Sequence, residues 1–229
     1  MHPLDLIKRL YATSSNARFI AHLRLGGVKI GRNVIFRNPR SCRVDVSRPS
    51  LVSIGDNVDF NDNFQLLTHD WACTVFRIKY HDFVNSSGHV TIGSNIYFGA
   101  NVIVLKGVTI GDNCVIAAGS LVTHDIPANS VAAGLPCRVI CSIDEYYQKR
   151  KRCGLEEARE YVRSIRDRYG REPKVSELYE EFIYFVDKHN IADYPELPIR
   201  IQLGEGYDEW LATHIAPYDS VSDFLKSIT

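Results

Sequence analysis

A six-residue repeat runs from Ile92 to Pro127 and limits the possible folds more than any other feature of the chain. Each block of six opens with an apolar residue: Ile92, Phe98, Val104, Ile110, Ile116 and Val122. The fourth residue of each block tolerates a left-handed backbone or completes a turn with its own side chain. These fourth residues are Asn95, Asn101, Gly107, Asn113, Gly119 and Asp125. The pattern fits a short strand followed by a corner, and its period predicts a β-helix of hexapeptides.

The same repeat begins earlier in the chain and is interrupted once. Four apolar residues are separated by multiples of six positions and so share one phase of the repeat: Ile30, Ile54, Phe60 and Leu66. The stretch 36–53 has the length of three hexapeptides but a poor pattern, so we predict one irregular coil there. The block that starts at Ile92 is two residues out of phase with the earlier one, so we predict an excursion over 67–91. The excursion is rich in aromatic and polar residues, and it carries His69, His81 and His89. Because long loops on rigid scaffolds often carry function, we expect the functional site there.

Helical patterns flank the repeat. Residues 4–25 place apolar side chains three and four apart, which predicts a helix with a break at 13–16. After the coil the sequence becomes charged, and Ser142 followed by Glu145 is typical of a capping box. A second helix is expected over 176–189. The predicted parts are an N-terminal helical segment (1–27), a β-helix domain (28–141) and a C-terminal helical extension (142–229).

Composition narrows the function classes. The 27 basic and 27 acidic residues balance, so no overall field attracts nucleic acid or anionic lipid. Six cysteines form no CxxC pair, which favours free thiols in a reducing compartment. The N-terminus has no apolar signal core, and no window approaches the length of a membrane span. We therefore expect a cytoplasmic protein with no nucleic-acid partner and no integral membrane segment.

The repeat resembles that of the left-handed β-helix acyltransferases. Residues 54–140 are similar to maltose and galactoside O-acetyltransferases in the segments IGDNV, TH, VTIGSN, GVTIGDN, AAGSLVTHDIPANSVAAG and PCRVI. The N-terminal helix and the charged segment after the coil are similar to acetyltransferases encoded with surface-polysaccharide genes. The resemblance implies an all-β core with helical appendages, a left-handed parallel β-helix that forms a homotrimer. It also implies acetyl-CoA as the acetyl donor and no metal.

Transfer of an acetyl group to a sugar requires a base, because a sugar hydroxyl is a weak nucleophile at neutral pH. A neutral histidine within hydrogen-bond reach is suited to that role. In the resembling family the histidine of the TH motif is the catalytic base, and it matches His69. A partner must fix its tautomer, and the sequence names none. Trp71 is a candidate either to stack on a sugar ring or to pack the loop, and Asn85 matches a loop asparagine near the acceptor.

The resemblance also implies where coenzyme A binds. In the family its pantetheine arm lies along the outside of the coil, between neighbouring subunits. The small residues beneath it match Ala100 and Ala118, which the corners of the coil need in any case. Thr123 and His124 match a Thr-Lys pair near the nucleotide end, with histidine in place of lysine. Arg138 matches an arginine that contacts phosphate, a pairing that charge-assisted hydrogen bonds favour.

Four functions stay open at this point. The resemblance favours an acetyl-CoA-dependent O-acetyltransferase that modifies a sugar in surface-polysaccharide biosynthesis, such as that of capsule or O-antigen. The second is an N-acetyltransferase of an amino-sugar nucleotide, or an antibiotic acetyltransferase. The third is a zinc hydrolyase of the β-helical carbonic anhydrase type, although the spacing of the loop histidines defines no such site. The fourth is a non-enzymatic trimeric scaffold.

Overall fold

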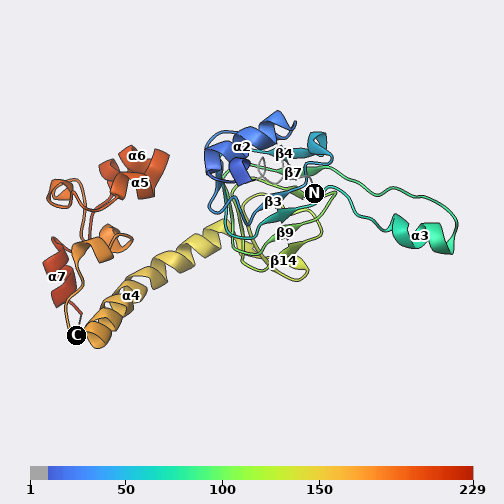
Figure 1. Cartoon of the computed structure of the whole chain (residues 1–229). Helices are drawn as coiled ribbons and strands as arrows, with labels where there is room; N and C mark the ends of the chain where they lie inside the picture. The colour runs from blue at the N-terminus through green and yellow to red at the C-terminus, as the bar shows by residue number, and fades with distance from the viewer. Residues whose placement is uncertain (1–9, 229) are drawn as a thin grey trace. The chain divides into compact units, whose positions relative to one another are not determined.

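The computed structural model describes residues 10–228, so the part of the predicted N-terminal helix before residue 10 lies outside the described residues. Contacts divide the chain into one unit that ends at Tyr147 and another that begins at Gln148. The first unit holds three parallel β-sheets and the second is helical (Figure 1). No helix in the described range combines the length and apolar character that crossing a bilayer requires.

Consecutive strands of the first unit lie in different sheets as far as β13. The first sheet contains β1 (Lys29–Ile30), β4 (Val52–Ile54), β7 (Val90–Ile92) and β10 (Thr109–Ile110). The second contains β2 (Ile35–Phe36), β5 (Val58–Phe60), β8 (Ile96–Phe98), β11 (Cys114–Ile116), β13 (Ser130–Gly134) and β14 (Cys137–Ser142). The third contains β3 (Arg43–Val44), β6 (Gln65–Leu66), β9 (Ile103–Val104) and β12 (Leu121–Val122). Among the named strands of residues 10–228, only those of the final hairpin, β13 and β14, pair antiparallel. The predicted fold class, a left-handed parallel β-helix with helical appendages, is confirmed.

The predicted apolar positions fill the inside of the coil. All six residues that open the hexapeptides of 92–127 are at most 2 % exposed. Phenylalanine rings from successive coils stack in one column, with centroids 4.5 Å apart for Phe36 and Phe60 and 4.9 Å apart for Phe60 and Phe98. The six-residue period therefore exists because each face of the coil contributes two side chains, such as Ile96 and Phe98, to a shared interior.

The predicted turn formers occupy the corners. Asn95, Asn101 and Asn113 adopt φ values of 58°, 61° and 57°, and Gly107 and Gly119 adopt 81° and 72°. Asp125 acts through its side chain instead, because its Oδ1 accepts a hydrogen bond of 2.7 Å from the Thr109 amide. Asparagines at the same corner of successive coils also form side-chain hydrogen bonds. Asn95 donates to Asn113 at 2.8 Å, and Asn113 donates to Asn129 at 2.9 Å.

The structure has irregular segments near both predicted interruptions of the repeat. Between β2 and β4, the predicted irregular coil carries β3 and the short 3₁₀ helix η1 (Pro49–Leu51). The excursion leaves the coil after β6 and returns at β7, and in Figure 1 it projects from the sheets. It contains a helix that the sequence analysis does not predict, α3 (Cys73–Lys79).

Helix α2 (Asn16–Leu25) precedes the coil. The Ser15 hydroxyl accepts a hydrogen bond of 3.3 Å from the Arg18 amide, which fixes the start of the helix after the predicted break at 13–16. Gly27, with φ of 104°, follows its end. The ring of Phe19 meets Phe36 edge-on at 4.9 Å, so α2 covers the apolar interior of the first coil.

Helix α4 (Ile143–Tyr169) begins with the predicted capping box. The Ser142 amide donates to Glu145 Oε2 at 2.8 Å, and the Glu145 amide donates to Ser142 Oγ at 3.2 Å. Beyond α4 come η2 (Val175–Glu177), η3 (Glu181–Tyr184), η4 (Ile191–Asp193), α5 (Ile199–Leu203), η5 (Gly204–Gly206), α6 (Tyr207–Thr213) and α7 (Val221–Lys226).

The prediction of a second α-helix over 176–189 is wrong, because this stretch forms the 3₁₀ turns η2 and η3. Side chains take backbone groups that an α-helix would use. His214 Nε2 lies 2.8 Å from the Ile183 carbonyl oxygen, and Asn190 Oδ1 accepts from the Asp187 amide at 3.0 Å. The apolar residues of the stretch are nevertheless buried: Leu178, Phe182, Phe185 and Val186.

Candidate active site

His69 is held at the corner where the excursion leaves the third sheet. Its Nδ1 lies 2.6 Å from Asp45 Oδ2 and 3.3 Å from Ser47 Oγ. Asp45 follows β3 in the preceding coil, so the parallel pairing of β3 with β6 brings the two residues together across 24 positions. The side chains of His69 and Asp45 are 23 % and 11 % exposed, which leaves the imidazole accessible while its partner is covered.

Asp45 is ionised and saturated with donors. Burial raises the pKa of its carboxyl, but hydrogen bonds from Ser47 and Thr68 outweigh that effect and hold the pKa well below its usual range. Ser47 donates to Oδ1 at 2.7 Å, and the Thr68 hydroxyl donates to Oδ2 at 2.6 Å. Because an ionised carboxylate can only accept, Nδ1 of His69 carries the hydrogen of their contact. In a neutral imidazole Nε2 is then the free base.

A second set of contacts fixes the residues around His69. The two limbs of the excursion pair through a bridge between His69 and Ser87, and the Gly88 amide donates to the Thr68 carbonyl at 3.0 Å. The Asp70 carboxylate points away from His69. It accepts from Ser86 Oγ at 2.9 Å and pairs with Lys106 of the next coil. Hydrogen bonds from Lys106, then from the Ala72 amide and Ser86, lower the pKa of Asp70 to about 2.

The predicted acceptor residues belong to the excursion. The Trp71 ring is 65 % exposed, and its centroid lies 6.5 Å from that of His69, with the rings at 67°. Asn85 is exposed and stands two positions before Ser87, the bridge partner of His69. Trp71 is thus open to solvent beside the imidazole rather than packed on the coil, and its role stays a prediction, as does that of Asn85.

The structure separates the predicted pantetheine positions from His69 within one chain. Ala100 lies between β8 and β9, and Ala118 lies between β11 and β12, at the corner from the second sheet to the third. The Ala100 carbonyl accepts from the Gly119 amide at 2.8 Å, which stacks these two corners. His69 instead lies at the corner from the third sheet to the first.

The predicted residues at the nucleotide end come together beside the last coil. A cavity of about 470 Å³ is lined by His124, Asp125, Ile126, Cys137, Arg138 and Val139. Thr123 Oγ1 lies 2.7 Å from His124 Nδ1, and Arg138 is exposed, with Nη1 donating to the Cys137 carbonyl at 2.8 Å. Thr123 and His124 follow β12, at the same type of corner as His69.

The other two histidines of the excursion do not join His69. His81 and His89 are exposed, and His81 adopts a φ of 55°. Across residues 10–228, no group of three or more His, Cys, Asp or Glu side chains converges as metal ligands would. The described residues therefore give no geometric support to the zinc alternative.

The sequence analysis missed Asp45 and Ser47, the partners of His69. The signal available was a short polar pair in the segment VDVS (44–47), within the irregular coil. Because the hexapeptide phase is lost there, counting in sixes does not place Asp45 opposite His69.

Comparison with known proteins gives the family. The family model described as the hexapeptide repeat of succinyl-transferase matches residues 89–124. The galactoside O-acetyltransferase of Escherichia coli (strain K12) is 39% identical over 158 residues, which is 63% of this chain and 72% of that protein. The structure of a maltose O-acetyltransferase from Clostridium difficile 630 is 31% identical, covers 60% of this chain and 83% of its own, and has a TM-score of 0.41. A galactoside acetyltransferase in complex with coenzyme A is 27% identical, with coverage of 60% and 78% and a TM-score of 0.39. The chain belongs to the hexapeptide-repeat acetyltransferases, and it is an acetyltransferase of the galactoside and maltose O-acetyltransferase type.

Proposed function

We propose that the chain transfers the acetyl group of acetyl-CoA to a sugar hydroxyl, with His69 as the general base. The observation that carries this proposal is the contact of 2.6 Å between Asp45 and His69 Nδ1, which leaves Nε2 as the accessible base. A base in that state can take a proton from a hydroxyl at neutral pH.

His69 moves one proton twice in this reaction. Nε2 takes the proton of the sugar hydroxyl while that oxygen forms a bond to the thioester carbonyl carbon. When the carbon–sulfur bond of the tetrahedral intermediate breaks, the imidazolium returns the proton to the departing sulfur. The products are an acetyl ester of the sugar and free coenzyme A. Asp45 stabilises the transient positive charge on the ring and keeps the ring oriented.

The donor is expected to use the outside of the coil. The Arg138 guanidinium and His124 line one cavity, where Arg138 would pair with a phosphate of coenzyme A. Small side chains at Ala100 and Ala118 leave backbone groups accessible to the pantetheine arm.

We also propose that the enzyme is a homotrimer with each site between two copies. The support is that His69 and the two alanines lie at different corners of one coil. Sedimentation velocity should give three times the chain mass. Coexpression of His69→Ala chains with Ala118→Trp chains, each inactive alone, should restore part of the activity. A mixed assembly without activity would contradict a site shared between copies.

We further propose that the reaction takes place in the cytoplasm and modifies a surface polysaccharide or its precursor. The support for the compartment is that all six cysteines are free, as expected of thiols in a reducing environment. The polysaccharide role rests on the resemblance of the N-terminal helix and the charged segment that begins α4.

A screen of acceptors with acetyl-CoA tests the proposed function. We expect galactosides and related hydroxyl-bearing sugars to give a product that neutral hydroxylamine cleaves, because hydroxylamine attacks esters and leaves amides intact. An amide product from an amino sugar would favour the N-acetyltransferase alternative. No product from any acceptor, together with no binding of acetyl-CoA by calorimetry, would favour the scaffold.

A further inference from the structure

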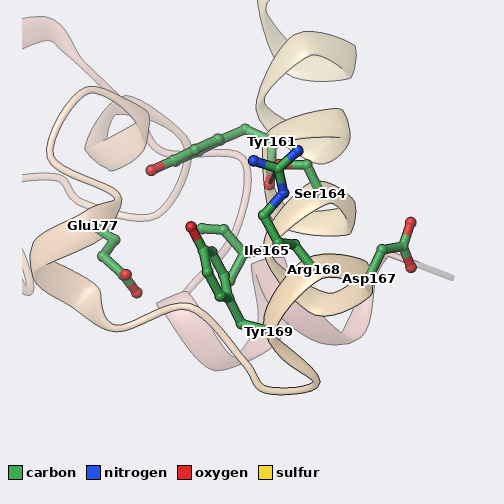
Figure 2. Close-up of a pocket in the computed structure, with 7 residues that line it drawn as sticks. All are labelled: Tyr161, Ser164, Ile165, Asp167, Arg168, Tyr169 and Glu177. Carbon is green, nitrogen blue, oxygen red and sulfur yellow. Dashed lines mark hydrogen bonds between the residues drawn. The ribbon is translucent and has the colours of Figure 1, made fainter.

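The helical unit that begins at Gln148 has its own core and a polar depression on its surface. Its buried residues include Val162, Phe185 and Phe224. A cavity of about 590 Å³ beside α4 is lined by Tyr161, Ser164, Ile165, Asp167, Arg168, Tyr169 and Glu177 (Figure 2). A neighbouring cavity of about 280 Å³ is lined by Tyr161, Glu177, Tyr179, Glu180 and Glu181. The two cavities adjoin at their shared residues, and we call them together the tyrosine pocket.

Three aromatic rings of the tyrosine pocket are open to solvent. Tyr161, Tyr169 and Tyr179 are 39 %, 60 % and 44 % exposed. In Figure 2, Tyr161 and Tyr169 project from α4 toward the segment that carries Glu177, whereas Asp167 points away. A tyrosine offers an apolar ring face beside a polar hydroxyl, so such rings suit a ligand that has both kinds of surface.

Hydrogen bonds hold the pocket in shape. Arg171 donates two hydrogen bonds of 2.7 Å to the Glu177 carboxylate, and the Lys174 amide donates a third of 2.7 Å. The bond from Arg171 is the main reason that the pKa of Glu177 falls to about 2, so this carboxylate is ionised. The same guanidinium lies 5.4 Å from the centre of the Tyr169 ring. One side of the pocket is therefore ordered before any ligand binds, which lowers the entropy cost of binding.

The lining offers hydrogen-bond donors and acceptors together. Hydroxyls come from Tyr161 and Tyr169, while Arg168 donates and Glu177 accepts. The Ser164 hydroxyl donates to the Tyr161 carbonyl and can still accept. A cation would use only the acceptors and an anion only the donors. A sugar presents hydroxyls that do both, and its flat C–H faces pack against aromatic rings. The carboxylates of Glu180 and Glu181 disfavour an anionic sugar.

We propose that the tyrosine pocket binds an uncharged glycan chain, at a site separate from His69. The proposal rests on the proposed function in one respect: the glycan is the acceptor of acetyl transfer.

Binding is measured first, without chemistry. The probe is a galacto-oligosaccharide of six sugars, titrated by calorimetry into the full-length His69→Ala protein. We expect Tyr161→Ala and Tyr169→Ala, each added to that background, to weaken binding about tenfold, as the loss of one stacked ring does. The matched control is Tyr147→Ala, an exposed tyrosine of the same helix that lines neither cavity. Tyr179→Ala repeats the test from outside α4.

The outcomes separate this proposal from the proposed function. If the hexasaccharide does not bind, or binds equally to all variants, the glycan site is overturned even if acetyl transfer is intact. Binding of an oligolysine peptide at the same tyrosines in place of the sugar also overturns it. If no sugar is acetylated but the binding results hold, the proposed function fails and the glycan site stands.

Discussion

His69 differs from the other two histidines of the excursion in what holds its ring. Nδ1 contacts a carboxylate that is covered and ionised, whereas His81 and His89 are exposed. The Asp45 carboxylate in turn accepts hydrogen bonds from Ser47 and Thr68. A chain of several hydrogen bonds therefore fixes the orientation of the imidazole. A base used in every turnover needs this restraint, because each wrong orientation or tautomer removes a fraction of the active enzyme.

The first prediction concerns Asp45→Asn. The asparagine keeps the size of the side chain but permits the tautomer with hydrogen on Nε2, so we expect kcat to fall roughly ten- to hundredfold, as for other residues that orient a functional histidine. Steady-state kinetics with acetyl-CoA and a galactoside measure this. Asp70→Asn is the matched control, because that carboxylate contacts Lys106 and Ser86 rather than His69. An Asp45→Asn enzyme with the kcat of the wild type would contradict the orienting role.

The second prediction concerns stability against acid. The folded-state pKa of Asp45 is depressed, so its contribution to stability is present above the unfolded pKa, about 4, and is lost as pH falls through the folded pKa. Asp70, with a pKa of about 2, acts in the same direction. We expect the thermal midpoint of the wild type to fall as pH drops below 5, and Asp45→Asn to show a lower midpoint at pH 7 and a smaller fall. Calorimetry between pH 7 and pH 3 measures both, and parallel curves would refute the assignment.

The sequence identifies the proposed base, His69, but not its partner. His69 is recognisable because the TH motif adjoins a phase break that can be counted along the chain. Asp45 contacts it only because β3, which lies in the irregular coil, pairs with β6. The six-residue pattern is broken in that coil, so the sequence pattern does not give the strand register that brings Asp45 to His69.

At the scale of the elements, the corners determine the coil. An asparagine at a corner adopts a left-handed backbone and also bonds to the asparagine of the next coil. Asn113 does both. Its φ is 57°, and its side-chain amide forms hydrogen bonds with those of Asn95 and Asn129. The repeat therefore specifies backbone conformation and stacking with the same residue.

The third prediction separates these two contributions. Asn113→Ala should lower the free energy of unfolding by about 2 kcal/mol, because alanine is strained in the left-handed region and the side-chain bonds are lost. Asn113→Gly loses only the bonds and should cost about half as much. Urea unfolding measures the difference. Equal losses would show that the backbone conformation contributes nothing.

The sequence predicts the elements well where one interior fixes the period. The hexapeptides are an example, since every face of the coil points to the same core. The stretch 176–189 shows the opposite case. Its apolar spacing is helical and its apolar residues are buried, yet His214 and Asn190, which follow it in the chain, take backbone groups that an α-helix needs. Such contacts cannot be read from a local pattern.

At the scale of the whole molecule, the chain combines two units with separate cores. The fourth prediction is that Phe224→Ala destabilises the helical unit by about 4 kcal/mol and leaves the coil protected, because Phe224 is fully buried in the helical core only. Hydrogen exchange followed by mass spectrometry resolves the two units. Phe60→Ala, in the core of the coil, is the matched control and should show the reverse pattern. Loss of protection throughout the chain in both variants would indicate one cooperative unit.

The central claim is that this acetyltransferase uses His69 as its base, and the acetyl-transfer rate of His69→Ala tests it most directly. With acetyl-CoA and a galactoside acceptor, we predict a loss of kcat of roughly a thousandfold, the usual contribution of a positioned general base. His89→Ala is the control and should stay within about twofold of the wild type, because surface changes away from such features have small effects. A folded His69→Ala enzyme that keeps most of its turnover would contradict the account.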